Sequence, residues 1–198
     1  MDSYDNLPDY EIKEMGDMSK KFLDLNISSF KEACLYVQDM EYGYNSDKDD
    51  PMILFKEKCG SCTTKHGVVA TLAEELGIPL YKKVCVYKFT EEITTGVHEI
   101  LKKYDIPYVP MVHCFLVYEK NQFDLTEGNI NGKKKSIDDY IYAEKVEPFI
   151  SRRDEYRLFR KILKDKIMPS EEMQGISERI LLKAREEAIV LLKMAIQK

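Results

Sequence analysis

The chain of 198 residues contains no tryptophan, only three histidines and no excess of basic residues. Its 30 basic and 35 acidic residues give a formal net charge of −5. Proteins that grip the phosphates of a nucleic acid usually carry a basic stripe or patch. The one short run of that kind here is Lys133-Lys134-Lys135. We therefore expect no nucleic-acid partner.

Long apolar runs are also missing, and none approaches the roughly 20 residues that a membrane-spanning helix needs. The first residues, Met-Asp-Ser-Tyr-Asp, lack the basic and apolar regions of an export signal. An odd number of cysteines without such a signal fits free thiols in a reducing compartment better than a disulfide framework. We expect a cytoplasmic protein with no membrane partner. Its cysteines are Cys34, Cys59, Cys62, Cys85 and Cys114.

The patterns that are present divide the chain into a polar N-terminal segment (1–28), a core (29–135) and a helical C-terminal extension packed on that core (136–198). Ser29 and Glu32 form the Ser-x-x-Glu pattern of a capping box, which predicts a helix over 29–40. A second helical pattern follows Cys62 and ends at Gly77-Ile78-Pro79. Further along we expect a strand over 81–89, a helix over 92–104 and a hairpin of 112–118 with 122–126. This order indicates an α+β fold.

The C-terminal extension is predicted to be helical over 137–149 and 153–167, with a long amphipathic helix after Ser170. Apolar residues of this last helix recur at helical spacing, for example Ile180, Ala184 and Ala188. Such a stripe is typical of a core face or of a dimer seam. A homodimer through this helix is therefore among our expectations.

The segment Cys59-Gly60-Ser61-Cys62 stands at the N-terminal end of the predicted central helix. Backbone N–H groups at a helix N-terminus lack intrahelical partners, and the helix dipole favours negative charge there. A cysteine in that position is biased toward the thiolate, which is the nucleophilic form.

A cysteine nucleophile needs a base to take its proton and a third group to orient that base. His113 lies near the start of the first hairpin strand, and Asp124 lies in the second. With Glu119-Lys120 at the turn, Asp124 faces Phe115 and is diagonal to His113 on the same face of the hairpin. Diagonal neighbours are roughly 7–8 Å apart, which an aspartate side chain can span. The sequence thus predicts a triad of Cys62, His113 and Asp124.

The order of these motifs resembles the catalytic core of the transglutaminase-like cysteine enzymes, a superfamily similar in plan to papain-type proteases and arylamine N-acetyltransferases. The resemblance covers roughly residues 36–128. It implies a papain-like core in which the cysteine-bearing helix packs on an antiparallel sheet. It also implies Cys62 as nucleophile, His113 as general base and later acid, and Asp124 as the orienting group. The implied reaction is acyl transfer from an amide or ester of a peptide or small substrate to water or an amine, without a cofactor.

In that superfamily the oxyanion of the tetrahedral intermediate is held by the backbone N–H of the nucleophile and by a second donor. Candidates for oxyanion or substrate binding are Ser61, next to the nucleophile, and Tyr44 or Asn45 from the acidic loop that precedes the helix.

Cys59 and Cys62 also form a Cys-x-x-Cys pair before a helix, as in thioredoxin-like redox proteins. The segment 103–110 resembles the part of those proteins that carries a cis-proline, with Pro110 in that role. In this alternative the helix begins near Cys59, which would be the attacking thiolate, while His113 and Asp124 have no assigned task.

Two further alternatives stay open. A zinc site of Cys59, Cys62 and two of His66, His113 and Cys114 lacks the second Cys-x-x-Cys or His-x-x-x-His motif that would make it a strong prediction, so we expect no metal. His66 lies one helical turn after Cys62 and is interpreted as a solvated surface residue. The core could also serve only as a binding module.

Overall fold

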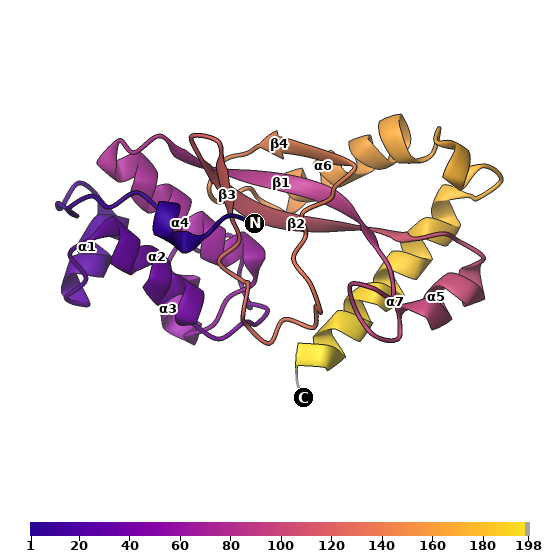
Figure 1. The fold of residues 1–198 in the computed structure, drawn as a ribbon, viewed down its shortest axis with the longest axis horizontal. Coiled ribbons are helices and arrows are strands. Elements are labelled where there is room, and N and C mark those ends of the chain that lie inside the picture. Colours follow the sequence, from indigo (N-terminus) through magenta and orange to yellow (C-terminus); the bar gives the residue numbers. More distant parts are fainter. Residues whose placement is uncertain (197–198) are drawn as a thin grey trace. The chain divides into compact units, whose positions relative to one another are not determined.

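The computed structural model describes residues 1–196, which form seven α-helices and a four-stranded antiparallel sheet with strand order β3-β2-β1-β4 (Figure 1). The α+β prediction is therefore confirmed. None of the helices in this range is long and apolar enough to cross a lipid bilayer. The helices are α1 (Asp17–Asp24), α2 (Phe30–Asp39), α3 (Ile53–Glu57), α4 (Cys62–Leu76), α5 (Val97–Tyr104), α6 (Arg152–Ile162) and α7 (Glu178–Ile196), and the strands are β1 (Leu80–Phe89), β2 (Val109–Tyr118), β3 (Asn121–Phe123) and β4 (Tyr142–Lys145).

The chain forms two compact units, and it passes from one to the other several times. The first unit comprises residues 1–84, 114–129 and 144–151, and the second comprises residues 85–113, 130–143 and 152–198. Strands β1, β2 and β4 each contribute residues to both units. The division at 28/29 and 135/136 stays a prediction.

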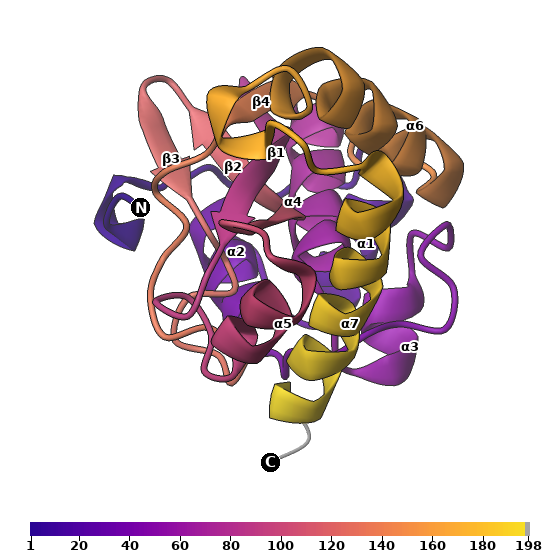
Figure 2. The ribbon, with the colours of Figure 1, turned by 90° about the vertical axis from the view of Figure 1, so that its right-hand side faces the viewer.

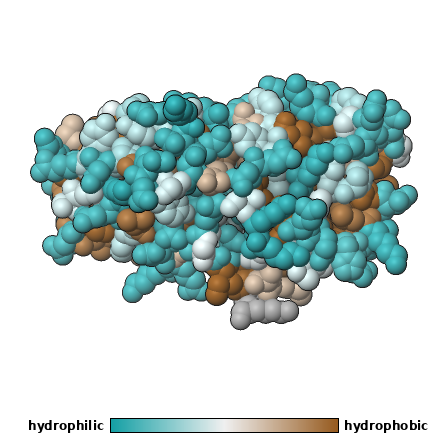
Figure 3. Space-filling model, viewed as in Figure 1, coloured by the Kyte–Doolittle hydropathy of each residue, from teal (hydrophilic) through white to brown (hydrophobic). Residues whose placement is uncertain are grey.

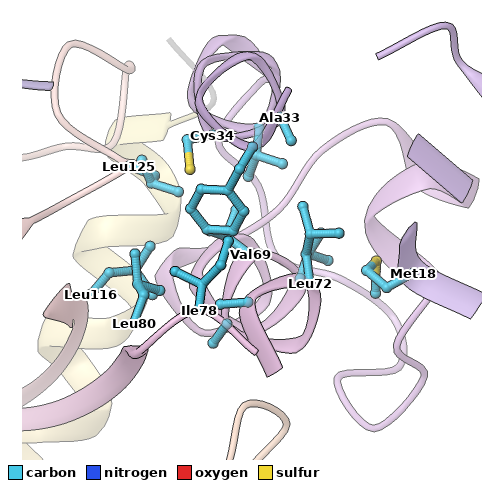
Figure 4. Packing of buried hydrophobic residues seen from close by; sticks show 14 of the residues in the cluster. Met18, Ala33, Cys34, Val69, Leu72, Ile78, Leu80, Leu116 and Leu125 are labelled. Atoms are coloured by element: carbon cyan, nitrogen blue, oxygen red, sulfur yellow. The ribbon is translucent and has the colours of Figure 1, made fainter. Parts of the chain in front are cut away.

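In the first unit, α4 lies at the centre and packs against α1, α2 and α3. Val69 and Leu72 of α4 meet Leu80 of β1 and Leu116 of β2 in one buried apolar cluster (Figure 4). A helix that is surrounded on several sides buries residues around most of its circumference, whether they are apolar or polar. Accordingly, every residue from Ser61 to Ala70 is buried.

In the second unit, α5 packs against α7, and the two helices run side by side (Figure 2). The contact has a polar edge, where Lys103 and Tyr104 of α5 both bind the carboxylate of Glu187 on α7. Helix α6 continues into a π-helical turn, Leu163–Ile167, before α7 begins. This unit therefore holds most of the predicted C-terminal helices.

Several local predictions are confirmed by the structure. The Ser29 hydroxyl accepts the backbone N–H of Glu32 and caps α2, and Gly77 ends α4 in the left-handed conformation. The predicted hairpin register is also correct, because Leu116 pairs with Phe123 across β2 and β3. The second strand, predicted over 122–126, ends instead at Phe123 and does not include Asp124.

The helix predicted over 137–149 is wrong, because residues 142–145 form the edge strand β4. The backbone N–H of Ile141 bonds to the carbonyl of Val86, and that of Val146 bonds to the carbonyl of Lys82. Pairing with the open edge of β1 satisfies backbone groups that a helix would satisfy internally. Pro148 also opposes a helix at this point.

Carboxylates cap the first turns of two helices: α1, which is not among the predicted helices, and α5, which begins later than predicted. Within the N-terminal segment, α1 begins where Glu75 of α4 accepts the N–H groups of Met18 and Ser19. Helix α5 begins at Val97 instead of residue 92, because Glu91 accepts the N–H groups of Gly96 and His98. These hydrogen bonds, above all the one from His98, lower the pKa of Glu91 to about 2.

The face of the molecule in Figure 3 is largely hydrophilic, with hydrophobic residues in separate patches. On α7, Val190 and Met194 are more than half exposed and lie one turn apart. The homodimer through this helix stays a prediction.

Gly67 marks a close approach within the first unit. A Cβ at this position would lie 2.9 Å from the carbonyl oxygen of Pro148 and 3.2 Å from the ring of Phe149. That carbonyl is held in place because it accepts a hydrogen bond from Lys82 Nζ at 2.8 Å.

We therefore expect Gly67→Ala to lower the free energy of unfolding by about 1–3 kcal/mol, as overpacking does. Helix propensity alone would raise it by about 1 kcal/mol. Urea denaturation at pH 7 measures the difference. Glu74→Ala on the exposed side of the same helix is the control, and a Gly67→Ala protein as stable as that control would contradict the close approach.

Candidate active site at the N-terminus of α4

Cys62 is the first residue of α4, as the sequence predicts, and its side chain is 9% exposed. Ser61 is the N-cap residue, but its hydroxyl makes no capping hydrogen bond, and the first turn contains no acidic residue. The first turn of α4 therefore has no carboxylate that would neutralise the positive end of the helix dipole next to the Cys62 thiol.

Lys65, also in the first turn of α4, has a completely buried side chain. Its ammonium donates to the carbonyls of Gln38 and Met40 at the end of α2 and to the side-chain oxygen of Asn129. Burial lowers the pKa of Lys65 to about 8, although Asp124 and other acidic groups act in the opposite direction. This lysine joins the first turn of α4 to two remote segments of the unit.

A second buried lysine, Lys82 of β1, donates to the carbonyl of Thr63 at 3.0 Å and to that of Pro148. The Thr63 hydroxyl is 3.7 Å from the sulfur of Cys114 on β2. The residue that follows Cys62 is therefore fixed to the sheet by both its backbone and its side chain.

Asp124 follows β3 and is 2% exposed. Its Oδ1 accepts the backbone N–H of Thr126 at 2.9 Å and the Thr126 hydroxyl at 2.7 Å. His66 of α4 is buried instead of solvated, with its Nε2 at 3.4 Å from the same Oδ1. This Nε2 also accepts the N–H of Leu125 at 2.8 Å. The turn that carries Asp124 is thus fixed against the helix that carries Cys62.

His113 lies in β2 within the second unit and is 1% exposed. The ring of Tyr87 on β1 meets it edge to face, with centroids 6.3 Å apart. Its Nδ1 is 3.3 Å from the ammonium of Lys133. A buried imidazole in contact with an ammonium was not expected from the sequence.

Of the predicted triad, Cys62 and Asp124 belong to the first unit and His113 to the second. The triad stays a prediction. Sequence reasoning missed the contact of His66 with Asp124, for which the only signal was the place of His66 one turn after Cys62. It also missed the contact of Lys133 with His113, since nothing in the lysine run distinguishes its first member.

The predicted oxyanion and substrate-binding residues differ in what they have to offer. Both N–H groups of the Asn45 side chain are used, because its Nδ2 donates to Glu57 and to the carbonyl of Cys59 at 2.9 Å each. Tyr44 is 42% exposed and packs edge to face on Tyr42. Ser61 is buried beside the thiol. The geometry therefore favours Ser61 and the adjacent backbone over the amide of Asn45.

Cys59 lies before α4, in a short stretch where Glu41 pairs with it as an isolated bridge. Its sulfur lies close to Gly43, where a Cβ would be 3.0 Å away. Burial, with Glu57 and Glu41, raises the pKa of Cys59. All five cysteines are free thiols.

Two observations concern the redox and zinc alternatives. Pro110 lies inside β2, and no cis peptide bond occurs among residues 1–196. In the same range no group of three or more His, Cys, Asp or Glu side chains is arranged to hold a metal ion.

Comparison with models of protein families, with curated proteins and with solved structures finds no match to this chain.

We expect Lys65→Met to lower the free energy of unfolding by roughly 3–5 kcal/mol, because three buried acceptors lose their donor. Urea denaturation at pH 7 measures the loss. Lys102→Met, at an exposed position of α5, is the control and should stay within about 0.5 kcal/mol of the wild type. Equal effects of the two substitutions would show that the buried ammonium does not hold α4 in place.

The lowered pKa of Lys65 also predicts a pH dependence. Below about pH 8 the lysine is charged in both the folded and the unfolded chain, so the cost of burying the charge is present in full. Between pH 8 and its unfolded pKa near 10.4 the unfolded chain binds more protons, so the folded chain gains stability as pH rises. The stability of the wild type relative to Lys65→Met should therefore increase by up to roughly 3 kcal/mol from pH 7 to 10.5.

Burial also raises the pKa of Cys34 and of Tyr4, which lowers stability at high pH. The wild type and Lys65→Met both contain Cys34 and Tyr4, so the contributions of these two groups cancel in the difference between the two free energies of unfolding. Urea denaturation of the two proteins at a series of pH values tests the relation. A constant difference across this range would contradict it.

Proposed function

We propose that this protein is a cysteine-dependent acyl-transfer enzyme of transglutaminase-like plan, which acts on an amide or ester of a peptide or small substrate. One observation carries the proposal. The thiol of Cys62 lies at the first residue of a 15-residue helix, and hydrogen bonds of two buried lysines hold the first turn of that helix in place. A nucleophile fixed at the positive end of a helix has both its thiolate and the oxyanion of its product stabilised by the same backbone N–H groups.

In the proposed reaction, the proton of the Cys62 thiol passes to the unprotonated ring nitrogen of His113. The sulfur then forms a bond to the carbonyl carbon, and the oxyanion is held by the backbone N–H of Cys62 and a second donor. Collapse of this intermediate breaks the bond to the amine or alcohol, which leaves with the proton of the imidazolium. Water or an amine attacks the resulting thioester, gives a proton to His113 and releases the acyl product and the thiol.

The proposal assigns Asp124 the task of orienting the base. Its support is that this carboxylate is nearly buried and is fixed by Thr126, so that it keeps one direction. The hairpin register from which we expect Asp124 to be diagonal to His113 is observed at Leu116 and Phe123, but β3 ends at Phe123, so Asp124 lies beyond the paired residues.

Thiol–disulfide exchange by Cys59 and Cys62 is the second candidate, and two observations favour acyl transfer over it. The helix begins at Cys62 and not near Cys59, so the helix dipole stabilises the thiolate of Cys62 and not that of Cys59. The raised pKa of Cys59 also makes it a poor attacking thiolate.

We expect p-nitrophenyl acetate to leave one acetyl group on Cys62 at pH 7, detected by mass spectrometry of the intact protein and of its peptides. Cys62→Ser should abolish this adduct. His113→Ala should slow its formation by about 10²-fold or more, because general-base catalysis is lost. Cys59→Ser should leave the rate unchanged.

Circular dichroism of each variant shows whether it is folded. Acetylation of Cys59 instead of Cys62, with no effect of His113→Ala, would favour redox chemistry. A folded wild-type protein that forms no adduct would leave the binding module as the remaining function.

A further inference from the structure

Lys133 is the first of three consecutive lysines, and its environment differs from that of the other two. Lys135 binds Glu92 at 2.7 Å, and Lys134 is 3.8 Å from Glu91, both at the surface. The ammonium of Lys133 is directed instead at the ring of His113, at 3.3 Å from Nδ1. One member of the run therefore points at a buried imidazole while its neighbours pair with carboxylates.

The backbone around Lys133 is held by several contacts within the second unit. The N–H of Lys133 donates to the side chain of Asn131 at 2.9 Å, and the N–H of Lys134 donates to the carbonyl of Ile93 at 2.7 Å. The carbonyl of Gly132 accepts the hydroxyl of Thr94 at 2.8 Å. The contact with His113 therefore rests on an anchored turn, and not on the flexibility of a lysine side chain alone.

An ammonium has three hydrogens and no lone pair, so in this contact Lys133 donates and Nδ1 of His113 accepts. The proton of the neutral ring then lies on Nε2. The lone pair of Nδ1 is the one that must take the proton of the thiol in the proposed reaction. In the proposed reaction, Lys133 and the thiol would therefore compete for this single lone pair.

An ammonium gains more from a carboxylate than from a neutral ring nitrogen, because the hydrogen bond is then charge-assisted on both sides. Glu91 and Glu92, which contact the other two lysines of the run, already face Lys134 and Lys135. The aromatic ring of Tyr87 contacts the imidazole ring of His113 edge to face and offers it no charge. An anion that arrives with the substrate would draw the ammonium of Lys133 away from His113.

We propose that Lys133 is the specificity residue of this site: it occupies the basic nitrogen of His113 at rest and leaves it for the carboxylate of an anionic acyl substrate. This inference rests on the proposed function, since it assigns a task to the base of that reaction. The substrate class it names is an acyl compound with a carboxylate close to the reacting carbonyl. The base is then available chiefly when such a substrate is bound.

Iodoacetate and iodoacetamide test the inference, because they alkylate a thiolate by the same reaction and differ in charge. In each case the sulfur forms a bond to the methylene carbon and iodide leaves. The measured quantity is the ratio of the two alkylation rates at Cys62, with the site located by mass spectrometry. We expect Lys133→Met to lower the iodoacetate-to-iodoacetamide ratio by at least about fivefold, the effect of one unit charge at contact distance in water.

Lys133→Arg should restore most of the ratio, because it keeps the charge. Lys134→Met and Lys135→Met are matched controls from the same run and should leave it unchanged. The rate with iodoacetamide alone should rise in Lys133→Met, since the lone pair of His113 is no longer occupied. A ratio that is equal in wild type and Lys133→Met, or that falls equally in Lys134→Met, would overturn the inference while leaving the proposed function intact.

A second measurement does not depend on the reactivity of the thiol. The nitrogen chemical shifts of His113, from the full-length protein labelled with ¹⁵N, should identify the Nε2–H form in the wild type. Lys133→Met should move the titration of this histidine to higher pH, and Lys134→Met should not. An Nδ1–H form in the wild type would overturn the inference whatever the thiol does. If Cys62 reacts with neither reagent, the proposed function fails, and this inference fails with it.

Discussion

The buried ammonium of Lys65 is the interaction on which the geometry around Cys62 depends. It joins three acceptors from the end of α2 and from the turn at Asn129 to the first turn of α4. Taking a charge out of water is costly, and the cost is recovered only when each hydrogen of the ammonium meets an oxygen. Because those oxygens belong to segments remote in sequence, the start of α4 and the places of these segments are determined together. Lys82 has the same relation to Thr63 and Pro148.

The two buried histidines differ in the sign of the charge beside them. His66 lies next to the carboxylate of Asp124, and its Nε2 already accepts the N–H of Leu125. His113 lies next to the ammonium of Lys133. The Nε2 lone pair of His66 is occupied by the N–H of Leu125, whereas an ammonium beside His113 favours the neutral ring that acts as a base. This contrast gives His66 a task in fixing the Asp124 turn and leaves the proton transfer of the proposed reaction to His113.

Local signals in the sequence were sufficient wherever one segment determines its own structure. The Ser29 cap, the end of α4 at Gly77 and the hairpin register all follow from residues a few positions apart. The beginning of α1 could not be predicted in the same way, because the carboxylate that caps it comes from Glu75 on another helix. Strand β4 likewise depends on the open edge of β1, and its own residues, Tyr142–Lys145, have no pattern that requires a strand. For the site, the position of Cys62 was predictable from the helix pattern, but the buried lysines were not, since a lysine in a sequence is usually read as a surface residue.

The burial of every residue from Ser61 to Ala70 has a consequence for how this protein can diverge. A helix on the surface accepts many substitutions on its outer side, whereas α4 has no outer side in its first two turns. Thr63, Lys65 and His66 each contact specific neighbours here, so polar character does not make these positions permissive. Among distant relatives, this stretch should therefore drift more slowly than the rest of the chain even if the chemistry of Cys62 has been lost.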